Sequence, residues 1–166
     1  MRTGTKTPLA ALLQGIAAGA AGTMVFTGYQ ALIGKGEGGK QPRRWADAPE
    51  PAQVGKRVLE GVFQRKVTLA QVPTLTQAVH WAYGTGWGLA YAVIQESVRR
   101  PLVSGVTLAT AITAADYTLL PLMKLYDRPW EYEPKTLVKD FGHHLVHGLA
   151  VAGAYKLIDA TRSRSS

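Results

Sequence analysis

The sequence predicts an all-α, polytopic membrane protein with four transmembrane helices arranged as two parallel two-helix repeats. Three observations lead to this fold class. The first is charge: residues 7–34 and 67–95 carry none, and residues 101–123 carry only Asp116. Each stretch exceeds the roughly 20 residues that cross the hydrocarbon core of a bilayer. The second is the abundance of glycine and alanine in these stretches, which is typical of helices that pack closely together in lipid.

The third observation is an internal repeat. Adding 64 to the residue numbers of one phrase gives a second, so that His80, Gly84, Gly88 and Tyr91 become His144, Gly148, Ala152 and Tyr155. Each phrase lies in the second helix of a pair, and a pair of helices returns the chain to the same side of the membrane. The copies are therefore expected to be parallel, and residues 1–166 are expected to form a single membrane domain.

The fourth span is the weakest, because only 15 residues, 141–155, separate Asp140 from Lys156. The alternative is a soluble, Ala/Gly-rich helical bundle with one or two hydrophobic hairpins. The net charge of +8 does not indicate a nucleic-acid partner, because the basic residues flank apolar runs, as they do beside membranes. The absence of cysteine excludes disulfides and thiolate metal sites.

The first helix is expected over residues 8–33. Gly15, Gly19 and Gly22 form a strip of small residues that favours close contact with another helix. The glycine- and proline-rich segment after it predicts an irregular connection. Residues 52–66 then show apolar residues at helical spacing with basic residues between them, which predicts a short amphipathic helix in the membrane interface. This helix is a candidate docking site for an anionic lipid or a protein partner.

Three further membrane helices are expected over residues 75–95, 102–123 and 136–158. Pro121 is expected to kink or end the third membrane helix, because proline lacks a backbone donor. The glycines expected at contacts between these helices are Gly84, Gly88 and Gly148. The oligomeric state and the orientation in the membrane stay open at this point.

The ionisable residues inside these helices are expected to meet at one level of the membrane. At 1.5 Å per residue, His80, Asp116 and His144 lie roughly 8–12 Å from the same end of the bundle. A lone ionisable group is costly in hydrocarbon, so mutual pairing is the expected solution. On a helical wheel, Asp140 and the other histidines of the last helix share a face with His144. The candidate proton or ion pathway therefore consists of His80, Asp116, Asp140, His143, His144 and His147.

Three interpretations of this polar group stay open. It can support proton- or ion-coupled activity, because histidine titrates near neutral pH and intramembrane Asp/His sets relay protons. It can bind a haem iron or a divalent metal, for which the candidate ligands are His80, His144 and His147. It can also be a hydrogen-bonded structural feature of a scaffold without catalytic activity. The sequence holds no strong metal signature and no nucleophile motif, so it favours neither a cofactor nor an enzyme.

Three phrases within about residues 74–158 carry a resemblance to a known family: HWAYGTGWGLAY, DYTLLPLMKLYDRPWEY and HHLVHG. They are similar to a repeated His-x-x-Tyr-Gly phrase and a proline-containing third helix in the YagU-like proteins, a family of uncharacterised function. The resemblance implies a small, multi-pass protein of the bacterial inner membrane and no particular activity. In this chain the second phrase has His147 where tyrosine is expected from the family.

Overall fold

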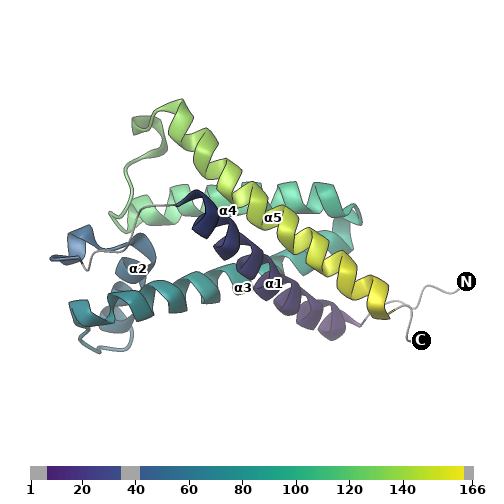
Figure 1. Cartoon of the computed structure of the whole chain (residues 1–166), viewed down its shortest axis with the longest axis horizontal. Coiled ribbons are helices and arrows are strands. Elements are labelled where there is room, and N and C mark those ends of the chain that lie inside the picture. The colour runs from purple at the N-terminus through teal and green to yellow at the C-terminus, as the bar shows by residue number, and fades with distance from the viewer. Residues whose placement is uncertain (1–6, 35–41, 163–166) are drawn as a thin grey trace, which may run out of the picture. The chain divides into compact units, whose positions relative to one another are not determined.

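The structure is a computed structural model that describes residues 7–34 and 42–162, and these residues form five α-helices and no strand (Figure 1). The all-α prediction is therefore confirmed. The helices are α1 (Pro8–Ile33), α2 (Glu50–Gly61), α3 (Val72–Val98), α4 (Pro101–Leu122) and α5 (Pro134–Arg162). Three short 3-10 turns lie between them, at Trp45–Asp47, Leu69–Gln71 and Pro129–Glu131.

The helix ends follow local sequence chemistry. Thr7 begins α1 by accepting a hydrogen bond on Oγ1 from the backbone N–H of Ala10, at 3.2 Å. Prolines occupy the first position of α1, α4 and α5, where a missing N–H costs nothing. Pro121 is the penultimate residue of α4, so it lies at the end of that helix.

One helix is shorter than the sequence predicts. The amphipathic helix expected over residues 52–66 is α2, which ends at Gly61. The chain leaves the helix because Gln64 takes the left-handed conformation, with φ of 51°. The backbone N–H of Arg65 then closes the turn on the carbonyl of Leu59 at 2.8 Å. The basic pair that follows Gln64 therefore lies beyond the helix and not on its face.

The chain divides into two compact units. The first contains residues up to 30 and from 84 onward, which bring together most of α1, the second half of α3, α4 and α5. The second contains residues 31–83, with α2 and the first half of α3. Each unit has its own small hydrophobic core.

Within the first unit, α1 and α3 touch backbone to backbone. A Cβ atom added to Gly19 would lie 2.6 Å from the carbonyl oxygen of Thr85. One added to Gly88 would lie 2.8 Å from the Cα of Gly19 and would overlap the carbonyl of Gly15. Side chains cannot be accommodated at such separations, so glycine is required for this contact. Gly84 lies against Thr23 in the same interface.

The contact between α4 and α5 has the same construction. A Cβ added to Gly105 would meet the carbonyl of Gly148 at 3.0 Å and the Cβ of Ala152 at 3.3 Å. The repeat seen in the sequence thus recurs as a repeated mode of packing. Gly15 and Gly19 of α1 correspond to Gly105 and Ala109 of α4, and Gly84 and Gly88 of α3 correspond to Gly148 and Ala152 of α5.

Two further contacts join these pairs into a four-helix unit. Gly22 of α1 lies against the backbone of Val151 in α5. The rings of Tyr91 and Tyr155, which correspond in the repeat, lie 5.3 Å apart and are almost fully buried. Residues of all four helices build the core around them: Ala18, Tyr91, Ala92, Leu108, Ile112, Val151, Ala152 and Tyr155.

The second unit packs α2 against the beginning of α3. Ala52 and Gly55 are buried, and a Cβ added to Gly55 would lie 3.1 Å from Val79 and 3.3 Å from Leu75. The core of this unit is small and consists of Ala48, Ala52, Val72 and Leu75, with Trp45, Leu59, Val67 and Leu69 beside it.

Two of the helices, α1 and α4, are long and apolar enough to cross a membrane. Helices in the cores of soluble proteins and signal sequences share that length and composition. Within the described residues, α3 and α5 do not meet the same criterion, because histidine and other polar residues lower the hydropathy of both helices and charged residues also interrupt α5. Length and hydropathy thus indicate two candidate spans, where the uncharged stretches and the internal repeat predict four.

Gly88→Ala is expected to destabilise the first unit, because the added methyl group meets backbone atoms that cannot move independently. Overpacking of this kind costs about 1–3 kcal/mol. Gly86 lies two residues before Gly88 on α3, and a Cβ atom added to it would meet no other atom within 4 Å. Gly86→Ala therefore serves as the matched control. The control should be neutral or stabilising by up to about 1 kcal/mol, since alanine favours helix. Equilibrium unfolding of the two variants measures the difference, and equal stabilities would contradict the packing described.

Candidate functional site

The ionisable residues of α5 lie in two adjacent rows on that helix. Residues 140, 144 and 148 form one row at a spacing of four, and residues 143, 147 and 151 form the other. The first row contacts α4, and the second contacts α1. The predicted shared face exists, but it is wide enough to lie over two neighbouring helices.

His144 is held by α4 through both ring nitrogens. Its Nε2 lies 3.1 Å from Oδ2 of Asp116, and its Nδ1 lies 2.9 Å from Oγ1 of Thr113. The side chains of His144 and Asp116 are 20% and 19% exposed. Two groups that the sequence places at one depth are therefore in direct contact.

The hydroxyl of Thr113 allows two hydrogen-bonding arrangements around this histidine. Oγ1 also lies 2.9 Å from the backbone carbonyl of Ala109, and a hydroxyl carries one hydrogen. If the hydrogen points to His144, Nδ1 is unprotonated and Nε2–H donates to Asp116. If it points to Ala109, Nδ1 carries a proton and donates to Thr113. The ring can therefore gain a proton at Nδ1 when one hydroxyl rotates, without movement of heavier atoms.

Asp140 lies one turn before His144 in the same row. Its Oδ2 accepts a hydrogen bond of 2.6 Å from the hydroxyl of Tyr117 in α4. The ring of Tyr117 packs against Tyr126 and Tyr132 of the following loop, with centroids 5.7 and 5.6 Å away. The carboxylate thus has a fixed partner that an aromatic cluster holds in place.

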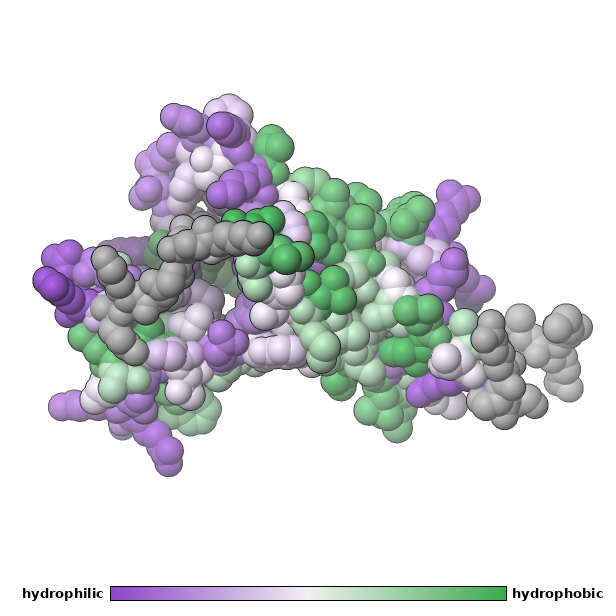
Figure 2. Space-filling model, in the orientation of Figure 1, coloured by the Kyte–Doolittle hydropathy of each residue, from purple (hydrophilic) through white to green (hydrophobic). Residues whose placement is uncertain are grey.

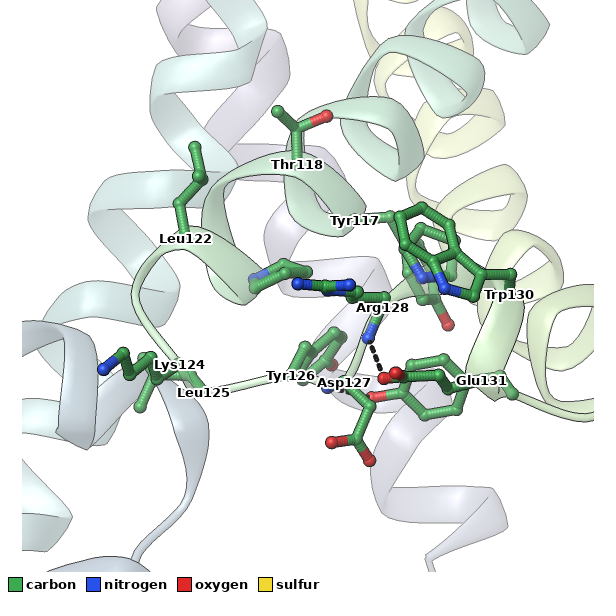
Figure 3. A pocket seen from close by; sticks show the side chains of 13 residues that line it. Tyr117, Thr118, Leu122, Lys124, Leu125, Tyr126, Asp127, Arg128, Trp130 and Glu131 are labelled. Atoms are coloured by element: carbon green, nitrogen blue, oxygen red, sulfur yellow. Dashed lines mark hydrogen bonds between the residues drawn. The ribbon is translucent and has the colours of Figure 1, made fainter.

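An open cleft of about 840 Å³ lies beside this cluster, between the end of α4 and the loop after it (Figure 3). Tyr117 lines the cleft and also bonds to Asp140, so it connects the cleft with the polar row of α5. On the loop side, Arg128 lies over the ring of Trp130 at 5.6 Å, and its backbone N–H donates to Glu131 at 2.8 Å. This cleft was not predicted, because most of its wall comes from the irregular loop after α4.

His143 and His147 face aromatic rings of α1. Phe26 lies 5.8 Å from His147 and 6.5 Å from His143, and Tyr29 lies 5.9 Å from His143. His147 is 5% exposed. These contacts are edge-on ring packing, and they place the two histidines against a different helix from the one that holds His144.

His80 belongs to the second unit, so its pairing with Asp116 and His144 stays a prediction. Within the described residues, no three side chains among His, Asp and Glu gather closely enough to hold a metal ion. His144 would have to give up one of its two hydrogen bonds to ligate a metal. Of the residues proposed as ligands, His144 and His147 contact different helices, α4 and α1.

A second polar cluster lies near the other end of the first unit, and sequence analysis missed it. Gln14 of α1 is 1% exposed, and its Nε2 donates to the carbonyl of Tyr155 and to Oδ1 of Asp159, both at 2.9 Å. The hydroxyl of Tyr155 donates to Oε1 of Glu96 at 3.1 Å. One signal was available, since the +64 repeat relates Gln95 to Asp159 and Tyr91 to Tyr155.

Comparisons with protein-family models, curated proteins and solved structures give no match to this chain. The resemblance to the YagU-like proteins therefore stays a prediction, and the site has to be interpreted from its own geometry.

Tyr117→Phe is expected to lower the free energy of unfolding by about 1–2 kcal/mol, because Asp140 loses a hydrogen bond to its carboxylate. Tyr29→Phe is the matched control, since Tyr29 has ring contacts but no hydroxyl partner among the described residues. The control should change stability by less than about 0.5 kcal/mol, the range of neutral substitutions. A loss of similar size in both variants would show that the Tyr117 hydroxyl contributes nothing specific.

Proposed function

We propose that this chain is a small integral protein of the bacterial inner membrane, in which four helices cross the bilayer and the His144–Asp116 pair exchanges protons. The observation that carries the proposal is the placement of His144 of α5 between Asp116 and Thr113 of α4, a helix apolar enough to cross a membrane. The resemblance to YagU-like proteins is consistent with this location.

The exposed apolar surface of α1 and α4 supports a place in lipid. Only 39% of the α1 window and 28% of the α4 window that could span a membrane are buried within the protein. Leu9, Leu102 and Leu122 are 66%, 74% and 77% exposed. A core helix of a soluble protein would cover such residues, and extended apolar surfaces mark contact with lipid or a partner. Figure 2 shows this hydrophobic surface over α1, α4 and α5, with hydrophilic residues gathered at the loop before α5.

We include α3 and α5 among the helices that cross the membrane for two reasons. At 27 and 29 residues, both are long enough to cross a bilayer. In α5, three of the ionisable residues also lie against other helices of the first unit: Asp140 and His144 contact α4, and His147 contacts α1. Ionisable residues in membrane helices are tolerated when they face the interior of the bundle in this way.

The surroundings of His144 favour a role in proton exchange over a purely structural role. A purely structural histidine needs one tautomer, whereas the Thr113 hydroxyl can satisfy Nδ1 with or without its proton. Asp116 balances the charge of the imidazolium when the proton is present. Protons can reach the same row of α5 from the cleft, through Tyr117 and Asp140.

The expected result in proteoliposomes is a protein-dependent collapse of an imposed pH gradient, followed with a trapped pH-sensitive dye. Asp116→Asn should abolish it, because a neutral amide cannot stabilise the protonated ring. Thr113→Val removes the Nδ1 partner with almost no change in volume and should slow the flux about tenfold, the value of one hydrogen bond to a charged group.

Thr110→Val is the matched control for this experiment. The hydroxyl of Thr110 donates to the carbonyl four residues earlier, at 3.0 Å, as Thr113 does, but Thr110 is exposed and does not contact His144. Its flux should equal that of the unaltered protein. A flux no greater than that of empty liposomes, or full flux in Asp116→Asn, would contradict the proposal.

A further inference from the structure

The end of α2 presents apolar side chains to the outside of the second unit. Val62 and Phe63 are 72% and 62% exposed, and Val58, one turn earlier, is 42% exposed. The left-handed turn at Gln64 and the Arg65–Leu59 backbone hydrogen bond hold this segment in a defined shape. We name residues 57–66 the α2 tip.

The α2 tip also carries an excess of positive charge. Its one acidic residue, Glu60, forms an ion pair with Lys56 and accepts a hydrogen bond from the backbone N–H of Val67 at 3.4 Å. The Lys56 hydrogen bond lowers the pKa of Glu60, so this carboxylate stays ionised and bound to Lys56 at neutral pH. Arg57, Arg65 and Lys66 are exposed, and Glu60, which also feels the charge of Lys66, is the one carboxylate beside them in the α2 tip, so positive charge is in excess there.

We propose that the α2 tip docks on the surface of a membrane that contains anionic phospholipid, with Val62 and Phe63 inserted below the headgroups and Arg57, Arg65 and Lys66 bound to phosphates. The occupant follows from charge complementarity, because three exposed cations flank the apolar residues in the sequence and one carboxylate opposes them. A patch of basic and apolar residues in this order is typical of segments that lie in the membrane interface.

This arrangement differs from the docking surface that the sequence predicts over residues 52–66. The first part of that segment is not available, because Ala52 and Gly55 are buried against α3. Lys56 is also engaged, both with Glu60 and over the ring of Trp45 at 5.6 Å. The surface is therefore confined to the end of α2 and the turn after it, and it does not depend on proton exchange by His144.

The absence of cysteine in the chain allows a direct test with the full-length protein in lipid nanodiscs. Val62→Cys is labelled with an environment-sensitive fluorophore, and quenching by lipid-attached quenchers is compared with quenching by aqueous iodide. In nanodiscs with phosphatidylglycerol, the label should be quenched from the lipid and protected from iodide. In phosphatidylcholine alone the protection should fall, and high salt should reduce it further. Thr68 is exposed and lies five residues beyond Phe63, so the same label on Thr68→Cys gives the quenching of a nearby polar position for comparison.

Charge variants separate specific docking from general attraction. Arg65→Gln with Lys66→Gln should lower the ratio of docked to undocked label roughly tenfold or more, given the contribution of each basic residue near an anionic surface. Arg99→Gln with Arg100→Gln removes the same charge elsewhere in the chain and should leave the label unchanged. Equal protection in both lipids would overturn the anionic preference. A label that iodide reaches in every lipid mixture would overturn docking on lipid and point to a protein partner for this surface.

Discussion

The close approach of helix backbones at glycine is the constraint on which the rest of this structure depends. In antiparallel helices, residues that face each other have numbers with a constant sum. Gly105 faces Ala152, Ala109 faces Gly148, and Thr113 faces His144, and each pair sums to 257. The small-residue contact between α4 and α5 thus fixes the register that places a hydroxyl against His144. Asp116 lies three residues after Thr113 on α4, so the same register also places its carboxylate against His144.

Such packing explains how a chain with little hydrophobic bulk in its core holds polar groups in place. Backbones in contact gain dispersion energy and leave no room for rotation of one helix about its axis. Polar side chains at the edge of the contact then have fixed partners, as Asp140 has in Tyr117 and Gln14 has in Tyr155 and Asp159. The two polar clusters lie on either side of an apolar layer that includes Leu108 and Val151.

The parts of the fold set by local pattern could be predicted from the sequence. The bounds of α1 follow from a proline at its start and a long uncharged run. The rise per residue of a helix placed Asp116 and His144 at one depth, and Oδ2 of Asp116 lies 3.1 Å from Nε2 of His144. The division of the α5 histidines between two neighbours could not be predicted, because a helical wheel gives the face and not the helix opposite it. The cluster around Gln14 was missed, because Glu96 and Asp159 lie near helix ends, where carboxylates are usually solvated.

The central claim, that α1, α3, α4 and α5 all cross the membrane, is tested most directly by mapping which side each connection faces. Single cysteines replace exposed residues at helix ends and in the connections, at Thr7, Arg43, Arg99, Asp127 and Arg162, and each is labelled in intact cells with an impermeant reagent. Four crossings require positions 43 and 127 on one side and positions 7, 99 and 162 on the other. Labelling of positions 43 and 99 from the same side would show that α3 does not cross, and the same result for 127 and 162 would exclude α5.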